Sequence, residues 1–154
     1  MIRIVLVRHA RPESAAAAGE LGPPLSAEGR ETHRKITQEL KQQGIVPTKI
    51  MCSPLTRAEQ TADVISDVFE GVPISITDLL DGTYTTQNIV DALAGLEDGE
   101  TVFLVGHVPN MTLLANSLSP EMVTDGVKKS GCVIFDFPDQ IILGRGTYIG
   151  YLHP

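Results

Sequence analysis

The stretch that most constrains the fold of this chain is a short apolar run at its start that ends abruptly in two polar residues. Residues 2–7 are rich in β-branched side chains, which favour strands, and the run is too short for a helix. Arg8 and His9 follow it directly. Ligands bind beyond the carboxyl ends of strands in open α/β sheets, so a site is expected here. A strand that simply reaches solvent remains the alternative on this pair alone.

Strand and helix patterns alternate along the rest of the chain. We predict further strands at residues 49–52, 72–77, 101–105, 133–137 and 147–151, and helices at about 27–43, 54–69, 87–96 and 111–118. Ser26 and Ser53 are the expected N-caps of the first two helices, with Pro54 at the first helical position. The pattern predicts one α/β domain over residues 1–154, a three-layer α/β/α sandwich around a mostly parallel sheet of about six strands. No helix separates the last two strands, so the sheet is expected to be mixed, with the last strand at an edge.

Composition excludes several classes of function. The 154 residues carry a formal net charge of -7, which disfavours nonspecific binding to nucleic acid or to an anionic membrane. No segment approaches the ~20 apolar residues of a membrane span, and no signal peptide is recognisable, so a cytoplasmic protein is expected. Cys52 and Cys132 lack metal-type spacing and are expected to be free, buried thiols.

Cations and imidazoles recur where predicted strands give way to helices. Arg8 and His9 follow the first strand, Arg57 lies in the first turn after the second, and His107 follows the strand at 101–105. If these strands are parallel, the four side chains meet at one end of the sheet, together with two helix N-termini. That arrangement suits a phosphate group, whereas no Gly-rich nucleotide loop is present.

Four ordered motifs resemble those of the histidine phosphatase superfamily, also called phosphoglycerate mutase-like. They cover most of the chain up to about residue 118, and the short length makes the small phosphohistidine phosphatases of the SixA type the most similar members. The motifs are Leu6-Val7-Arg8-His9-Ala10, Pro24-Leu25-Ser26-x-x-Gly29, Ser53-Pro54-Leu55-x-Arg57-Ala58-x-Gln60-Thr61 and Gly106-His107-x-Pro109.

The resemblance implies a phosphoglycerate mutase-like fold and a covalent mechanism without a metal or other cofactor. His9 would attack phosphorus, and Arg8, Arg57 and His107 would stabilise the transferring group. Val108 would contribute to phosphate binding. Larger members carry Thr and Asn where this chain has Pro12 and Ala15, and Ser14 is a substitute donor or an ordinary loop serine. Arg11 adds charge at the pocket rim or is a solvated loop residue.

The general acid is the least certain part of this resemblance. Many superfamily members supply a carboxylate after the third strand, where Asp81 is the best candidate and Asp78 the second. Asp81 is equally explained as a turn residue before Gly82, which would leave no acid. The P–N bond of a phosphohistidine is easier to cleave than a phosphate ester, so a weak or missing acid fits a phosphohistidine substrate.

The most concrete function is therefore a metal-independent phosphatase acting on phosphohistidine in proteins. The substrate would be a phosphorylated protein, such as a histidine-phosphotransfer domain, or a small phosphorylated metabolite, and a monomer is expected. A broad small-molecule phosphomonoesterase is the alternative, and a non-catalytic phosphate-binding module is a third possibility. A mutase is disfavoured because the chain lacks long lid insertions. His33 and His153 receive no chemical role.

Overall fold

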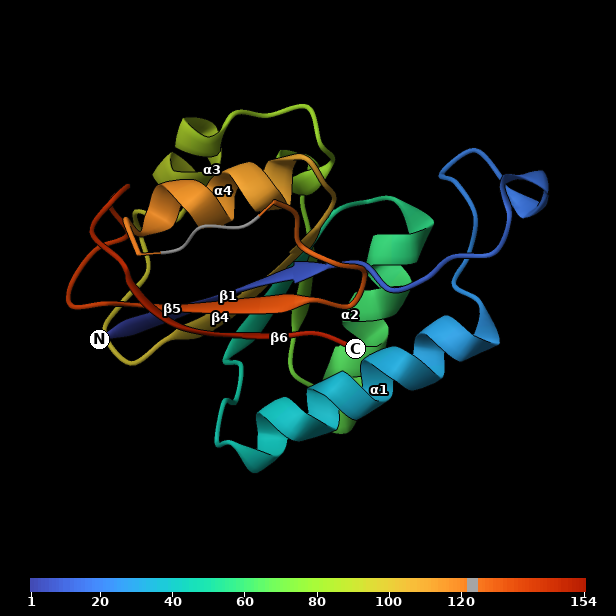
Figure 1. Cartoon of the computed structure of the whole chain (residues 1–154), viewed down its shortest axis with the longest axis horizontal. Coiled ribbons are helices and arrows are strands. Elements are labelled where there is room, and N and C mark those ends of the chain that lie inside the picture. The colour runs from blue at the N-terminus through green and yellow to red at the C-terminus, as the bar shows by residue number, and fades with distance from the viewer. Residues whose placement is uncertain (122–124) are drawn as a thin grey trace.

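A twisted six-stranded sheet forms the middle of the molecule in the computed structural model, which describes residues 1–121 and 125–154. Helices cover both of its faces (Figure 1). The strands are β1 (Ile2–Arg8), β2 (Lys49–Cys52), β3 (Ile74–Ile76), β4 (Thr101–Gly106), β5 (Cys132–Phe137) and β6 (Thr147–Leu152). The helices are α1 (Ala27–Gln42), α2 (Thr56–Val68), α3 (Thr86–Ala92) and α4 (Asn110–Leu118), with single 3₁₀ turns at Ala15–Ala17 and Asp78–Leu80.

The order of strands in the sheet is β3-β2-β4-β1-β5-β6. The first four in this order are parallel, while β5 and β6 pair antiparallel with their neighbours, so the predicted mixed sheet is confirmed. Arg8 lies opposite Gly106, and Cys52 opposite Val105. The carboxyl ends of β1, β2 and β4 therefore meet at one edge.

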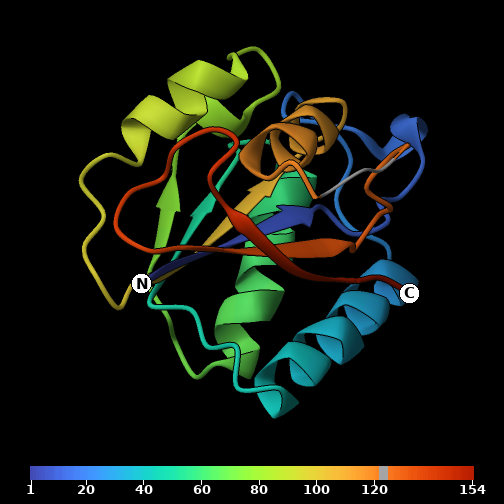
Figure 2. The ribbon, with the colours of Figure 1, turned by 60° about the vertical axis from the view of Figure 1, so that its left-hand side comes forward.

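The two faces of β1 pack against different helical layers. Val5 and Val7 belong to the core beneath α1 and α2, while Ile4 and Leu6 belong to the core beneath α3 and α4. All four side chains are completely buried. Figure 2 shows the strands passing between these layers. Burial on both faces explains why the run is apolar without alternation, and the predicted three-layer sandwich is confirmed.

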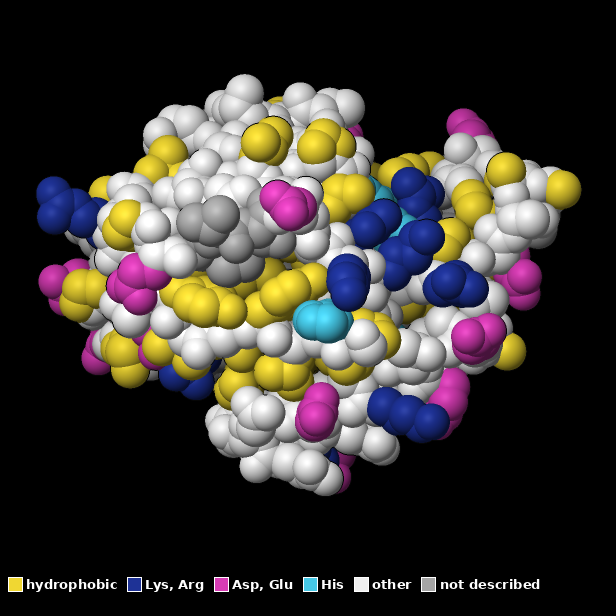
Figure 3. Space-filling model, viewed as in Figure 1, with side chains coloured by type: hydrophobic (Ala, Val, Ile, Leu, Met, Phe, Trp, Pro, Cys, Tyr) yellow, Lys and Arg dark blue, Asp and Glu magenta, His cyan; other side chains and the backbone are white. Residues whose placement is uncertain are grey.

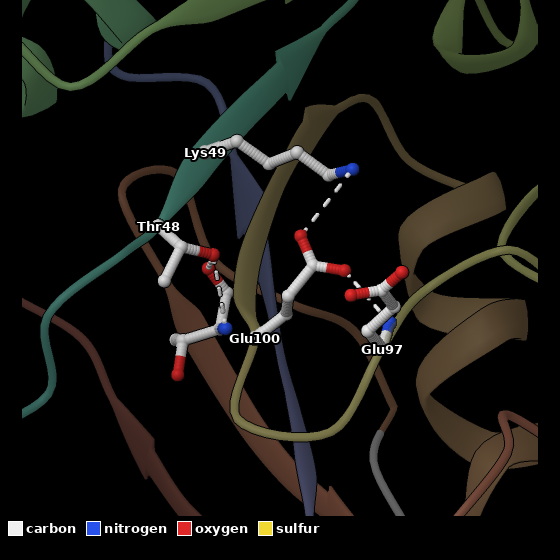
Figure 4. Close-up of polar contacts among 5 residues, drawn as sticks. Thr48, Lys49, Glu97 and Glu100 are labelled. Carbon is white, nitrogen blue, oxygen red and sulfur yellow. Dashed lines mark hydrogen bonds and ion pairs between the residues drawn. The ribbon is translucent and has the colours of Figure 1, made fainter.

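Polar contacts join β2 and β4 at the edge opposite the imidazoles (Figure 4). Thr48 Oγ1 donates to the carbonyl of Thr101 at 3.0 Å, and Lys49 Nζ lies 3.6 Å from Glu100 Oε1. The other carboxylate oxygen of Glu100 accepts from the backbone N–H of Glu97 at 2.8 Å. These contacts fix the register of the two strands whose opposite ends carry Ser53 and His107.

Two predicted elements are shorter in the structure. Strand 72–77 contracts to β3, because β3 lies at the sheet edge and pairs only with the four-residue β2. Helix 87–96 ends as α3 at Ala92, after which Leu93 and Leu96 donate to carbonyls three residues earlier instead of four. Both differences lie at the ends of elements, where local pattern is least informative.

The start of α1 is built against the loop that follows β1. Ser26 is the N-cap as predicted, and its hydroxyl accepts from the Gly29 N–H at 2.9 Å. The carbonyl of Arg11 accepts from both the backbone N–H and the hydroxyl of Ser26, at 3.0 and 3.1 Å. A Cβ on Gly29 would lie 2.2 Å from that carbonyl oxygen. The glycine of the motif Ser26-x-x-Gly29 is therefore explained by the close approach of the α1 backbone to that of Arg11.

We expect Gly29→Ala to destabilise the fold by about 3 kcal/mol, because the added methyl meets backbone that cannot move aside cheaply. For a chain of this length that corresponds to a fall in Tm of about 10 °C in thermal denaturation. Gly95→Ala is the matched control, since nothing lies within 4 Å of its added Cβ. Equal Tm values for both variants would contradict this explanation of the motif.

Candidate active site

Two histidines and an arginine meet where β1 and β4 end and α2 begins. The ring centroids of His9 and His107 are 5.2 Å apart, and Arg57 Nε lies 3.3 Å from His9 Nε2. Both imidazoles are buried. Figure 3 shows lysine and arginine side chains gathered on one face, with histidine visible among them. The structure thus brings together His9, His107 and Arg57, as expected from their positions at or just beyond the ends of parallel strands.

Hydrogen bonds fix which nitrogen of His9 carries the proton. Nδ1 lies 2.7 Å from the carbonyl oxygen of Ala10, and because a carbonyl only accepts, Nδ1 must be protonated. The backbone N–H of His9 donates to Gly106 at 3.1 Å, which holds the residue against β4. In neutral His9, Nε2 therefore carries the free electron pair and faces Arg57.

The surroundings of both histidines favour their neutral forms. The pKa of His9 is lowered from 6.5 to about 4, chiefly by burial and also by the charges of His107, Arg57 and Arg8, whereas the hydrogen bond to the Ala10 carbonyl acts in the opposite direction. Burial likewise lowers the pKa of His107 to about 4, assisted by Arg57 and Arg8, whereas Asp81 acts in the opposite direction. Both imidazoles are then unprotonated at neutral pH, which leaves His9 Nε2 available as a nucleophile.

An NMR titration of the ligand-free protein tests this protonation state. Because the pKa of each is lowered to about 4, the imidazole signals of His9 and His107 are expected to stay constant between pH 8 and pH 5.5. They should begin to shift only below about pH 5. A midpoint near 6.5 for His9 would show that burial and the neighbouring cations do not act as described.

The start of α2 differs from the prediction. The helix begins at Thr56 with Leu55 as its N-cap, so the expected capping by Ser53 and helical position of Pro54 are wrong. The hydroxyl of Ser53 instead accepts from the Leu55 N–H at 3.1 Å and lies 2.7 Å from His107 Nε2. The local pattern of Ser53-Pro54 is typical of a helix N-cap. The contact with His107 depends on the neighbouring strand β4, which the local pattern does not show.

The loop after β1 covers Arg57. A Cβ on Gly22, which has φ +90°, would lie 2.9 Å from Arg57 Nη1. The N–H of Thr56 donates to the Leu21 carbonyl at 3.1 Å, and that of Leu25 to Gln60 Oε1 at 2.7 Å. The long loop, which extends beyond the sheet in Figure 1, is thus attached to the first turns of α2.

Thr61 and Ser130 support the backbone around His9, and neither role was predicted from the sequence. Thr61 Oγ1 donates to the Arg57 carbonyl at 2.7 Å and accepts from the Ala10 N–H at 3.0 Å, so it connects α2 to the residue after His9. The N–H of Ser130 donates to the carbonyls of Arg8 and His9, at 3.2 Å each. The spacing of Arg57 and Thr61, one helical turn, was the available signal for the first of these.

His33 is packed inside the protein. It is 0% exposed, and its Nδ1 lies 3.0 Å from the hydroxyl of Ser130. Burial lowers the pKa of His33 to about 3, and the charge of His9 acts in the same direction. His33 therefore supports the backbone behind the site as a neutral side chain.

Arg8 lies between two hollows of the surface. Its Nη1 donates to the Val127 carbonyl at 3.0 Å, and its Nε is buried without a partner among the described residues. One hollow, of about 370 Å³, is shared with Arg11, and the other, of about 320 Å³, with Val108. Arg8 and Val108 are thus both placed at an open surface next to the imidazoles.

The remaining candidates are less closely connected to the imidazoles. Asp81 Oδ1 accepts from the N–H and hydroxyl of Thr83, at 2.8 and 2.6 Å, as a turn residue does, yet its charge acts on His107. Asp78 begins the 3₁₀ turn before it. Ser14 is exposed, and its hydroxyl forms no hydrogen bond with the described residues. Asp81 is therefore the acidic candidate that the electrostatics connect to His107.

Cys52 and Cys132 are free and buried, as predicted. Burial raises the pKa of each thiol to about 12, so neither supplies a thiolate at neutral pH. Among residues 1–121 and 125–154, no group of three or more His, Cys, Asp or Glu side chains is placed to hold a metal. No helix in the same part of the chain is long and apolar enough to cross a membrane.

The sequence model of the histidine phosphatase superfamily (branch 1) matches residues 4–83. No curated protein sequence matches the chain significantly. Among solved structures, the protein histidine phosphatase SixA complexed with tungstate superposes with a TM-score of 0.85 at 22% identity, over 97% of this chain and 96% of that one.

Other solved structures with the same fold are of proteins named as phosphatases of small molecules. Mycobacterial glucosyl-3-phosphoglycerate phosphatase has a TM-score of 0.69 at 18% identity, covering 96% of both chains. A phosphoserine phosphatase from Entamoeba histolytica, in complex with phosphoserine, has a TM-score of 0.63 at 16% identity, over 98% of this chain and 96% of that one. At these identities the similarity shows a shared fold alone.

Proposed function

Because the chain belongs to the histidine phosphatase superfamily and is a phosphatase, we propose that it transfers the phosphoryl group of its substrate to His9 and then to water. The observation that carries this proposal is the state of His9. Its Nδ1 donates to Ala10, its pKa is lowered to about 4, and its Nε2 lies beside a guanidinium that would hold phosphate. A neutral imidazole with its free pair among cations is suited to attack an anionic phosphoryl group.

The first step forms the bond from His9 Nε2 to phosphorus and breaks the bond to the leaving group, which departs with its electron pair. Arg57 and Arg8 stabilise the charge on the three oxygens of the transferring group. In the second step water attacks phosphorus, the N–P bond breaks, and inorganic phosphate leaves with His9 restored. Ser53 positions His107 beside His9 through the 2.7 Å contact at Nε2.

We propose phosphohistidine in a protein as the substrate. Among the described residues, Asp81 is the one whose carboxylate acts on the pKa of His107. It already accepts two hydrogen bonds from Thr83, so it is a poor general acid. An imidazole leaving group needs less assistance from an acid than an alkoxide does. A small-molecule phosphomonoester is the second candidate, favoured by the position of Asp81 close enough to influence His107.

Asp81→Asn separates the two candidates. With a phosphohistidine protein as substrate, kcat should change less than about threefold, whereas an ester hydrolase that uses Asp81 as its acid should lose at least about 100-fold. Both the variant and the wild type are assayed with EDTA present, on the phosphohistidine protein and on an alkyl phosphate such as phosphoserine, whose alkoxide leaving group needs an acid. A 100-fold loss on phosphohistidine would contradict the proposed substrate class.

A further inference from the structure

The hollow between Arg8 and α1 is bordered by three cations that the proposed reaction does not use, in addition to Arg8. Arg8, Arg11, Lys128 and Lys129 all contribute to its wall, within a volume of about 370 Å³. Glu28 is the single acidic side chain among the described residues that line it. Three cations beyond the catalytic arginine thus gather beside the site, although the chain as a whole carries a net charge of -7.

The backbone that carries the two lysines is held in place. We call residues 127–131 the lysine loop. The N–H of Lys128 donates to the hydroxyl of Tyr151 at 2.9 Å, and that of Ser130 donates to the Arg8 carbonyl at 3.2 Å. The loop is therefore fixed to both β6 and the end of β1, and its two lysines belong to a backbone that is held against that of Arg8.

Three cations of this hollow form no ion pair with the described residues, although Glu28 and Pro154 also line it. Arg11, Lys128 and Lys129 are exposed, and none lies within ion-pair distance of a described carboxylate. Arg3 and Lys49, by contrast, pair with Asp136 and Glu100. Unpaired cations held beside a phosphoryl site are free to attract an anionic partner.

We propose that this hollow is a second anion subsite that binds the Asp and Glu side chains flanking the phosphorylated residue of a protein substrate. The proposal rests on the proposed function, because it assumes that a phosphoryl group enters beside His9. A small dianion would be held best by donors that converge on one point. Here the exposed charged groups belong to two separate loops, which suits several carboxylates distributed over a protein surface.

The test uses a matched pair of double variants. Lys128→Gln with Lys129→Gln removes two charges from the subsite. Lys41→Gln with Arg145→Gln removes two exposed charges from the far end of α1 and from the loop before β6. Substrates are a phosphohistidine peptide flanked by Asp and Glu, the same peptide with Asn and Gln, a sugar bisphosphate, and p-nitrophenyl phosphate.

We expect the lysine-loop variant to raise KM for the acidic peptide about tenfold without changing kcat, and to leave the other three substrates within twofold. Raising ionic strength should reproduce the same loss in the wild type. Equal effects in the control pair, or an effect on the sugar bisphosphate and not on the acidic peptide, would overturn the proposal.

A binding measurement keeps the subsite testable if the proposed reaction is wrong. The probe is the acidic peptide carrying a nonhydrolysable phosphoryltriazole in place of phosphohistidine, followed by fluorescence anisotropy. Loss of affinity in the lysine-loop variant and not in the control pair supports the subsite even if the wild type hydrolyses none of the substrates. Unchanged affinity in both variants contradicts the subsite, whatever the turnover shows.

Discussion

Replacement of His9 by Ala is expected to lower kcat by about 10⁴-fold or more, because the reaction loses its nucleophile rather than an assisting group. The wild type should also form a covalent intermediate during turnover. It can be trapped by mixing with ³²P-labelled substrate and quenching in alkali, in which phosphohistidine survives. His9→Ala should trap no label.

His153→Ala is the matched control, since that histidine is exposed and its Nδ1 lies 2.9 Å from the carbonyl oxygen of its neighbour Pro154. It should keep wild-type kcat on p-nitrophenyl phosphate and still trap label. Thermal denaturation of His9→Ala separates chemistry from folding. A folded His9→Ala variant within tenfold of wild-type kcat would rule out the covalent mechanism proposed here.

Replacement of Arg57 by Ala is expected to lower kcat/KM by about 10²- to 10³-fold, the usual loss when one donor to a developing anion is removed. Arg57→Lys should recover only part of this loss, because lysine keeps the charge but lacks the planar fork that matches phosphate oxygens. The pKa of His9 should rise in Arg57→Ala, since the Arg57 charge lowers it in the wild type. Steady-state kinetics and the histidine NMR signals provide the two measurements.

Arg145→Ala removes an exposed arginine that lies away from the imidazoles and should leave kcat/KM unchanged. Full activity in Arg57→Lys would mean that a point charge is sufficient and that the fork is not used. Full activity in Arg57→Ala would mean that the phosphoryl group does not bind beside His9 Nε2.

Most of the fold could be predicted because burial leaves a simple pattern in the sequence. The apolar run of β1 and the N-cap of α1 are local features, and both were found where expected. The short β3 could not be predicted, because its length depends on the four residues of β2 that pair with it. The start of α2 was predicted wrongly for the same kind of reason, since the Ser53 hydroxyl contacts His107, which follows a strand about fifty residues later.

Local sequence patterns are enough to indicate the chemistry available to this protein. Two histidines and two arginines lie at or just beyond strand ends, and their convergence follows from parallel strands sharing one edge. How that chemistry is tuned depends on tertiary contacts. Burial and the carbonyl of Ala10 set the charge and tautomer of His9, and Thr61 and Ser130 hold the backbones around it. Tertiary contacts also place Arg11 and two lysines around one hollow beside Arg8. These properties depend on distances between segments far apart in the chain, which no local pattern encodes.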